Sequence, residues 1–76
     1  MKLRFIEYES SLYIVIGLTY DTTKDYPDCF VAIPLDATCK NIFSTLIIGH
    51  SINIPIVYAN EITDKNKLLM ILVLYG

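Results

Sequence analysis

The chain has 76 residues, of which six are basic and eight acidic, and its net charge is −2. This length predicts a single domain, residues 1–76, and the scattered basic residues argue against nucleic-acid binding. So small a domain usually needs disulfides, a metal or oligomerisation for stability. With two cysteines, one histidine and 54% hydrophobic residues, the composition favours a homo-oligomer.

The first two predicted elements are strands. Leu3 and Phe5 alternate with charged residues, and this run ends in the turn composition of residues 9–11. Residues 12–20 alternate with a period of two and predict a second strand. Leu12, Ile14, Ile16 and Leu18 are expected on one face, and Tyr13, Val15, Gly17 and Thr19 on the other. The short link between the strands predicts a β-hairpin.

A polar loop and a third strand follow. Residues 21–28 are polar and contain Pro27, which is typical of a loop. Residues 29–35 predict a strand near whose end Pro34 cannot donate a hydrogen bond. The row expected to face the core is Cys29, Val31, Ile33 and Leu35.

After Asp36 the apolar residues adopt helical spacing. Cys39, Ile42, Phe43 and Leu46 follow an i, i+3, i+4, i+7 pattern. This pattern predicts a helix over residues 37–48. Asp36 or Thr38 can cap its start, and Gly49 is expected to end it in a left-handed conformation.

Two more strands complete the predicted order βββαββ. Residues 52–59 alternate again, and Pro55 within them indicates an edge or a bulge. Their buried row is expected to be Ile52, Ile54, Ile56 and Tyr58. Residues 60–66 predict a polar loop, and residues 67–75 predict a last strand that is apolar on both faces.

This last strand carries the expected oligomer interface. A strand that is apolar on both faces needs cover on both sides. The single predicted helix covers only one of them, so a neighbouring subunit is expected to cover the other. The row assigned to this interface is Leu69, Ile71, Val73 and Tyr75.

Residues suited to catalysis or metal binding are few, which indicates a protein that is not an enzyme and holds no cofactor or metal. His50 is the one candidate base, and its place after the predicted helix suits a structural role at the helix dipole. Cys29 and Cys39 are ten positions apart; they are expected as buried free thiols, with a disulfide as the alternative in an oxidising compartment. Asp21, Asp25 and Asp28 share one loop, but their spacing does not match a calcium-binding loop.

Tyrosine is the one residue type that points to a ligand. The chain has six tyrosines, and a tyrosine offers an apolar face with a hydroxyl, which suits sugars and protein interfaces alike. Cross-strand packing explains such residues equally well. The candidate ligand-binding residues are Tyr20 and Tyr26, with polar atoms from Ser10 and Ser11.

Residues 41–58 (NIFSTLIIGHSINIPIVY), together with the order of the elements around them, resemble the B subunits of AB5 toxins of the pertussis-like and subtilase-cytotoxin-like branch. In that family a helix, a small residue and a strand occupy this stretch, and the helix lines the pore of a ring. The resemblance implies an OB-like five-stranded barrel, a homo-oligomeric ring such as a pentamer, a catalytic A subunit as partner and cell-surface glycans as ligands. The family's disulfide between neighbouring strands has no counterpart, because residues 12–20 contain no cysteine.

Two functions are compatible with these observations. The first is a glycan- or receptor-binding subunit of a toxin-like ring, which would be secreted after removal of a signal peptide. The second is a cytoplasmic oligomeric accessory protein, for instance of phage type, that acts through protein–protein contacts. Residues 1–9 lack the apolar stretch of a signal peptide, which favours the second. The βββαββ order, with a helix that ends at Gly49, favours the first. The apolar run at residues 68–75 is too short to cross a bilayer, so membrane insertion is not expected.

Overall fold

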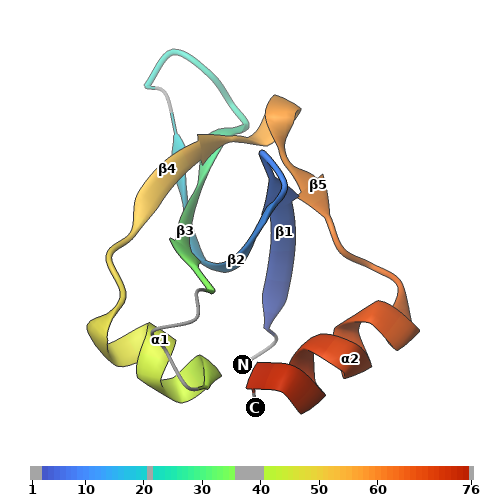
Figure 1. Cartoon of the computed structure of the whole chain (residues 1–76). Coiled ribbons are helices and arrows are strands. Elements are labelled where there is room, and N and C mark those ends of the chain that lie inside the picture. The colour runs from blue at the N-terminus through green and yellow to red at the C-terminus, as the bar shows by residue number, and fades with distance from the viewer. Residues whose placement is uncertain (1–2, 21, 36–40, 76) are drawn as a thin grey trace.

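The computed structural model describes residues 3–20, 22–35 and 41–75 (Figure 1). Five antiparallel strands form one open sheet in the order β4-β3-β2-β1-β5. The elements are β1 (Arg4–Tyr8), β2 (Ser11–Tyr20), β3 (Pro27–Pro34), α1 (Ile42–Ile48), β4 (Ile52–Pro55), the 3-10 helix η1 (Ile56–Tyr58), β5 (Asn60–Glu61) and α2 (Lys65–Tyr75). The expected mainly β class is confirmed. Among the described strands, no pairing of β4 with β5 closes the sheet into a barrel.

The predicted hairpin is formed by β1 and β2, with Tyr8 opposite Ser11. The two residues between them, Glu9 and Ser10, have φ values of 50° and 62°. Positive φ at both central residues is the mark of a type I′ turn, whose twist matches that of the flanking strands. Neither residue is the glycine or asparagine that this conformation favours, so the turn is strained.

A bulge in β2 changes which face its side chains occupy. Ile14 lies opposite Ile33, but the register shifts between Val15 and Gly17, and Leu18 then lies opposite Phe30. Because one extra residue in a strand reverses the alternation, the expected single row of Leu12, Ile14, Ile16 and Leu18 is wrong beyond Ile14. Ile16, at the bulge, is 49% exposed.

Each face of the sheet carries an apolar cluster. Phe5, Ile14 and Ile33 belong to the first cluster, which both helices cover through Ile42 of α1 and Ile71 of α2. The second cluster consists of Ile6, Phe30, Ala32 and Ile54. β3 is therefore buried on both faces, and its most buried residues are not the expected row. Ile33 and Leu35 of that row are buried, whereas Cys29 and Val31 are only half-buried.

Helix α1 begins later than expected, at Ile42, and Asn41 caps it. The Asn41 Oδ1 accepts a hydrogen bond of 2.8 Å from the Ser44 backbone N–H. The expected caps Asp36 and Thr38, and Cys39 of the expected stripe, lie outside the described residues. Phe43 was expected in that stripe but is 72% exposed, whereas Thr45, which was not expected there, is fully buried.

Gly49 ends α1 in an extended conformation, with φ −71° and ψ 150°, rather than in the expected left-handed one. Its N–H donates a 2.9 Å hydrogen bond to the Thr45 carbonyl oxygen. A Cβ at this position would overlap Ile33 Cγ2 and would lie 2.5 Å from the Thr45 carbonyl oxygen. Glycine is therefore required here by close approach.

The strand expected over residues 52–59 is shorter than predicted. β4 ends at Pro55, and the chain then turns through η1. Of the row expected to be buried, only Ile54 is fully so. Ile52 and Tyr58 are exposed and Ile56 is half-buried, because the turn at η1 breaks the alternation.

The C-terminal quarter differs most from the prediction. Residues 67–75 form helix α2 and no strand, and the fifth strand is β5, which lies in the expected loop. β5 pairs with β1, placing Glu61 opposite Ile6. Asp64 begins α2 by accepting a 2.8 Å hydrogen bond from the Asn66 N–H. No helix among the described residues is long and apolar enough to cross a membrane.

Candidate functional site: an exposed apolar surface

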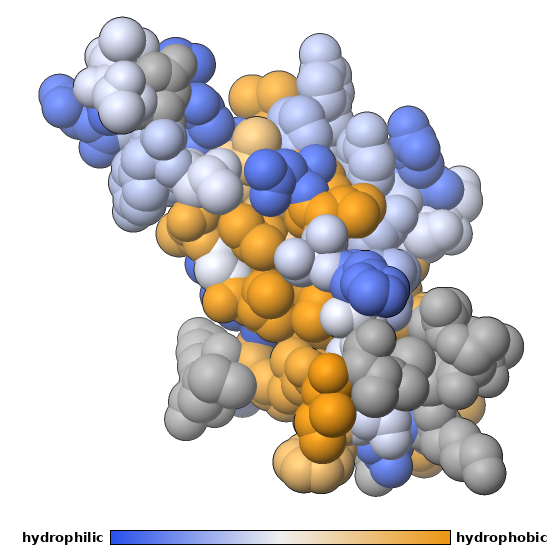
Figure 2. Space-filling model, turned by 90° about the vertical axis from the view of Figure 1, so that its left-hand side faces the viewer, coloured by the Kyte–Doolittle hydropathy of each residue, from blue (hydrophilic) through white to orange (hydrophobic). Residues whose placement is uncertain are grey.

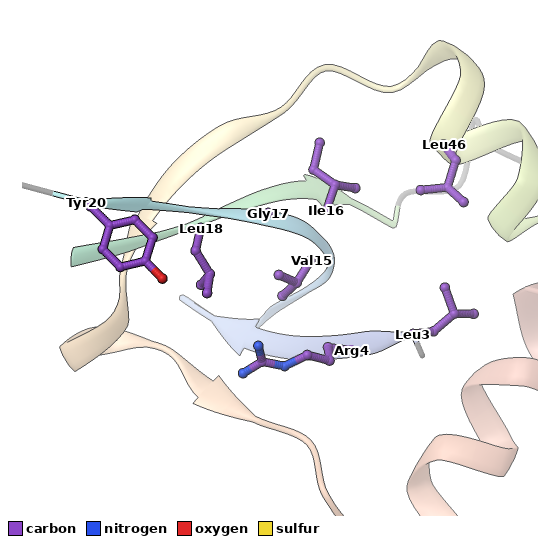
Figure 3. A pocket seen from close by; sticks show the side chains of 8 residues that line it. All are labelled: Leu3, Arg4, Val15, Ile16, Gly17, Leu18, Tyr20 and Leu46. Carbon is purple, nitrogen blue, oxygen red and sulfur yellow. The ribbon is translucent and has the colours of Figure 1, made fainter. Parts of the chain in front are cut away.

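A groove of about 490 Å³ lies beside β2, just after the bulge (Figure 3). β2 supplies most of its lining, including Ile16, Leu18 and Tyr20, and Leu46 of α1 closes one end. Leu3, Arg4, Val15 and Gly17 complete the lining. The groove is therefore built where β1, β2 and α1 meet.

The pairing of β2 changes along the groove. Their pairing ends at Arg4 opposite Val15, and from Gly17 to Tyr20 the ladder of β2 involves β3 alone. In the described part of the chain, the other edge of this half of β2 is unpaired. Unpaired strand edges are sites where another chain can add.

Among the described residues that line the groove, Arg4 is the only charged one. Its Nε donates to Glu61 Oε1 at 2.5 Å, and its guanidinium lies 5.3 Å from the centre of the Phe30 ring. Glu61 and Phe30 belong to the same chain as Arg4, so these contacts hold the Arg4 guanidinium at the margin of the groove. The remaining lining is apolar apart from the Tyr20 hydroxyl.

Helix α2 presents the second exposed apolar area. Only Ile71 is buried, and Leu68 and Tyr75 are half-buried on the same stripe against the first cluster. The exposed large apolar residues of α2 are Leu69, Met70, Leu72, Val73 and Leu74. Of the row expected at an oligomer interface, Leu69 and Val73 are thus exposed, whereas Ile71 and Tyr75 turn toward the chain's own core. A helix places alternate residues on different faces, so this row does not form one surface.

Apolar side chains also gather on the side of the molecule that carries α1 and β4 (Figure 2). The exposed members there include Phe43 and Ile47 of α1 and Ile52 of β4. Single exposed apolar residues are ordinary, but contiguous apolar areas mark interaction surfaces. Together with the exposed side chains of α2 and of the groove, these residues form an apolar surface that is large for a chain of this size.

The four residues expected to bind a ligand do not form one site. Tyr20 and Tyr26 are both 61% exposed, but Tyr20 lines the groove, whereas Tyr26 lines a different hollow beside Pro55. The Lys24 ammonium lies 5.8 Å from the centre of the Tyr26 ring. Ser10 and Ser11 are exposed at the hairpin end and line neither hollow.

The other residues considered for chemistry form no cluster in the part of the chain that the structure describes. His50 is exposed beyond the end of α1, and Cys29 is half-buried and free. Cys39 and Asp21 lie outside the described residues, while Asp28 pairs with Lys24 at 3.1 Å. No group of three or more His, Cys, Asp or Glu side chains suited to a metal ion occurs in the described part of the chain.

A group of tyrosines that sequence reasoning did not assign lies at the hairpin end. The rings of Tyr8 and Tyr13 meet edge to face, with their centres 6.3 Å apart. Tyr8, Glu9 and Tyr58 line a hollow of about 380 Å³. The abundance of tyrosine in the first third of the chain was the only available signal, and nothing local connected Tyr58 to it.

Comparisons of the chain with protein-family models, curated proteins and solved structures find no match.

Proposed function

We propose that this chain is a non-catalytic binding subunit that assembles with copies of itself and acts through protein–protein contacts. The observation that carries the proposal is α2, in which five large apolar side chains are exposed on a helix anchored by Ile71. Burying a large apolar side chain contributes about 1.5–3 kcal/mol. Five of them therefore provide a driving force of the size that association requires, about 4–15 kcal/mol.

A toxin-like ring is a finer form of the same proposal. It adds closure of the sheet into an OB-like barrel, a pentameric arrangement, a catalytic A subunit and glycan binding through the exposed tyrosines. The exposed rings of Tyr20 and Tyr26 support glycan binding, but their separate hollows support it less than one shared site would. The uncovered apolar surface favours protein contact as the primary activity.

Sedimentation velocity, with one matched pair of variants, tests self-assembly. Val73 of α2 is 83% exposed and Val57 of η1 is 84% exposed, so lysine at either position leaves the fold of the subunit intact. We expect the unmodified chain to sediment at a multiple of its 8.7 kDa mass. Val73→Lys should yield monomers because a charge in an apolar interface is costly, whereas Val57→Lys should assemble normally. A stable monomer of the unmodified chain at micromolar concentration contradicts the proposal.

Glycan binding needs its own measurement. The assembled protein is applied to a glycan array beside the Tyr20→Ala and Tyr26→Ala variants. Binding that either substitution removes supports the ring form of the proposal, because multivalency makes weak single sites effective. Binding that neither substitution alters, or no binding, restricts the function to protein contacts.

A further inference from the structure

The hollow lined by Tyr8, Glu9 and Tyr58 brings together residues from distant parts of the chain. Tyr8 ends β1, Glu9 belongs to the hairpin turn, and Tyr58 ends η1. The Tyr58 side chain is exposed, and the ring of Tyr8 meets that of Tyr13 edge to face. Two aromatic side chains and a carboxylate thus border a hollow of about 380 Å³.

The electrostatics of this hollow favour a positive charge. The pKa of the Tyr8 hydroxyl is raised above its ordinary value of 10.0, chiefly because the negative charge of Glu9 opposes its ionisation. Burial, a hydrogen bond with Glu9 and the neighbouring Tyr13 and Tyr58 act in the same direction. A negative potential that disfavours a phenolate attracts a cation to the same place.

Two other aromatic rings of the fold already have cations of their own. Arg4 lies over Phe30 and Lys24 over Tyr26. The hollow differs, since none of the described residues that line it is basic. Its rings and carboxylate are therefore available to a cation from another molecule.

We propose that Tyr8, Glu9 and Tyr58 bind a methylated ammonium group, as found in methylated lysine or choline. Tyrosine rings attract such a cation through their electron-rich faces and also contact its methyl groups, and a carboxylate adds its charge. Methylation weakens the hydration of the ammonium, so aromatic contacts replace its water at lower cost than for an unmodified amine. This site is independent of the apolar surface of α2.

The test is an NMR titration of the full-length protein with three probes. These are Nα-acetyl-trimethyllysine methyl ester, choline, and the neutral analogue of the first in which a tert-butyl group replaces trimethylammonium. We expect the cations to shift the amide resonances of Tyr8, Glu9 and Tyr58 with dissociation constants on the order of 1 mM, and the neutral analogue to bind at least about tenfold more weakly. Binding of the lysine derivative alone indicates a modified polypeptide as the source, binding of choline alone indicates a choline head group, and either supports the site.

Single substitutions then locate the binding. Tyr58→Ala and Glu9→Gln are each expected to weaken it about tenfold, whereas Tyr58→Phe, which keeps the ring, retains most of it. Tyr26→Ala is the control, because this equally prominent tyrosine lies beside Lys24 in another hollow. No binding of either cation, equal binding of the neutral analogue, or an equal loss in Tyr26→Ala would overturn the proposal. None of these outcomes bears on self-assembly, which is measured separately by sedimentation.

Discussion

Gly49 lies against Ile33 so closely that position 49 has no room for a side chain. The contact joins the end of α1 to the end of β3 and so fixes the helix on the first apolar cluster. Gly17 has room for a side chain, since a Cβ there would meet only Val31 Cβ, at an ordinary 3.9 Å.

This difference predicts opposite outcomes for two alanine substitutions. Gly49→Ala should lower the free energy of unfolding by about 1–3 kcal/mol, because Ile33 and the α1 backbone must move apart. Gly17→Ala should be neutral or stabilising by up to about 1 kcal/mol, since alanine reduces the entropy of the unfolded chain. Urea unfolding followed by circular dichroism measures both; equal effects would show that the close contact is not present in solution.

The hairpin turn predicts a stabilising substitution. Ser10 has a φ of 62°, which costs a residue with a side chain about 1–2 kcal/mol, and glycine adopts this conformation freely. Glycine is also more flexible in the unfolded chain, which offsets part of this gain. Ser10→Gly should therefore stabilise the domain by up to about 1 kcal/mol, which would raise Tm by at most about 4–8 °C. Ser10→Val, in which a β-branched residue is forced into the same conformation, should lower Tm. A lower Tm for Ser10→Gly would contradict the turn geometry.

The raised pKa of Tyr8 predicts how the folded domain responds to alkaline pH. The folded state favours the protonated phenol, so this contribution to stability is complete below the ordinary pKa of 10.0 and is lost as pH rises through the higher pKa of the folded state. Glu9→Gln removes the main cause, and the pKa of Tyr8 should fall toward its ordinary value. Ultraviolet titration of tyrosine ionisation, with Tyr8→Phe used to identify the signal of Tyr8, measures the shift. An unchanged Tyr8 titration in Glu9→Gln would show that the two groups are apart in solution.

Neighbouring positions of α2 predict contrasting effects of lysine. Ile71 is buried in the first cluster, and an unpaired charge there should cost more than about 4 kcal/mol and unfold the subunit. Val73, two positions later, is exposed, so its lysine variant should keep the far-ultraviolet circular dichroism spectrum of the folded chain and lose assembly alone. A folded Ile71→Lys subunit would show that α2 is not packed on the sheet as described.

The first three strands were predictable from the sequence, because local composition determines them, whereas the alternation over residues 52–59 predicted a strand that ends early, at Pro55. β1, β2 and their turn were found within one or two residues, and so was β3. The change of face in β2 was not found, since the bulge at Ile16 depends on pairing with β3 and leaves no local signal. β5 was missed because its two residues, Asn60 and Glu61, are polar and become a strand only by pairing with β1.

The assignment of α2 as a strand has a different cause. When every residue of a run is apolar, periods of 2 and 3.6 fit equally well. The residues that decide the question are Asp64, which caps the helix, and the leucines and Met70, which are not branched at Cβ and favour helix over strand. The candidate site was only partly predictable for the same reason: the surplus of apolar surface is visible in the composition, but which side chains remain exposed depends on how α2 lies on the sheet.

The pairing of β1 with β5 also bears on how the protein emerges from the ribosome. β1 is synthesised before residues 60–62, yet the N–H of Ile62 is the group that bonds to the Phe5 carbonyl oxygen, at 2.9 Å. Until residues 60–62 leave the exit tunnel, β1 has one bare edge and the first cluster lacks Ile62 and Ile71. Until then the nascent hairpin is open along this edge, a state prone to pairing with other chains. That edge is covered, and the first cluster is complete, only when β5 and α2 fold onto the hairpin.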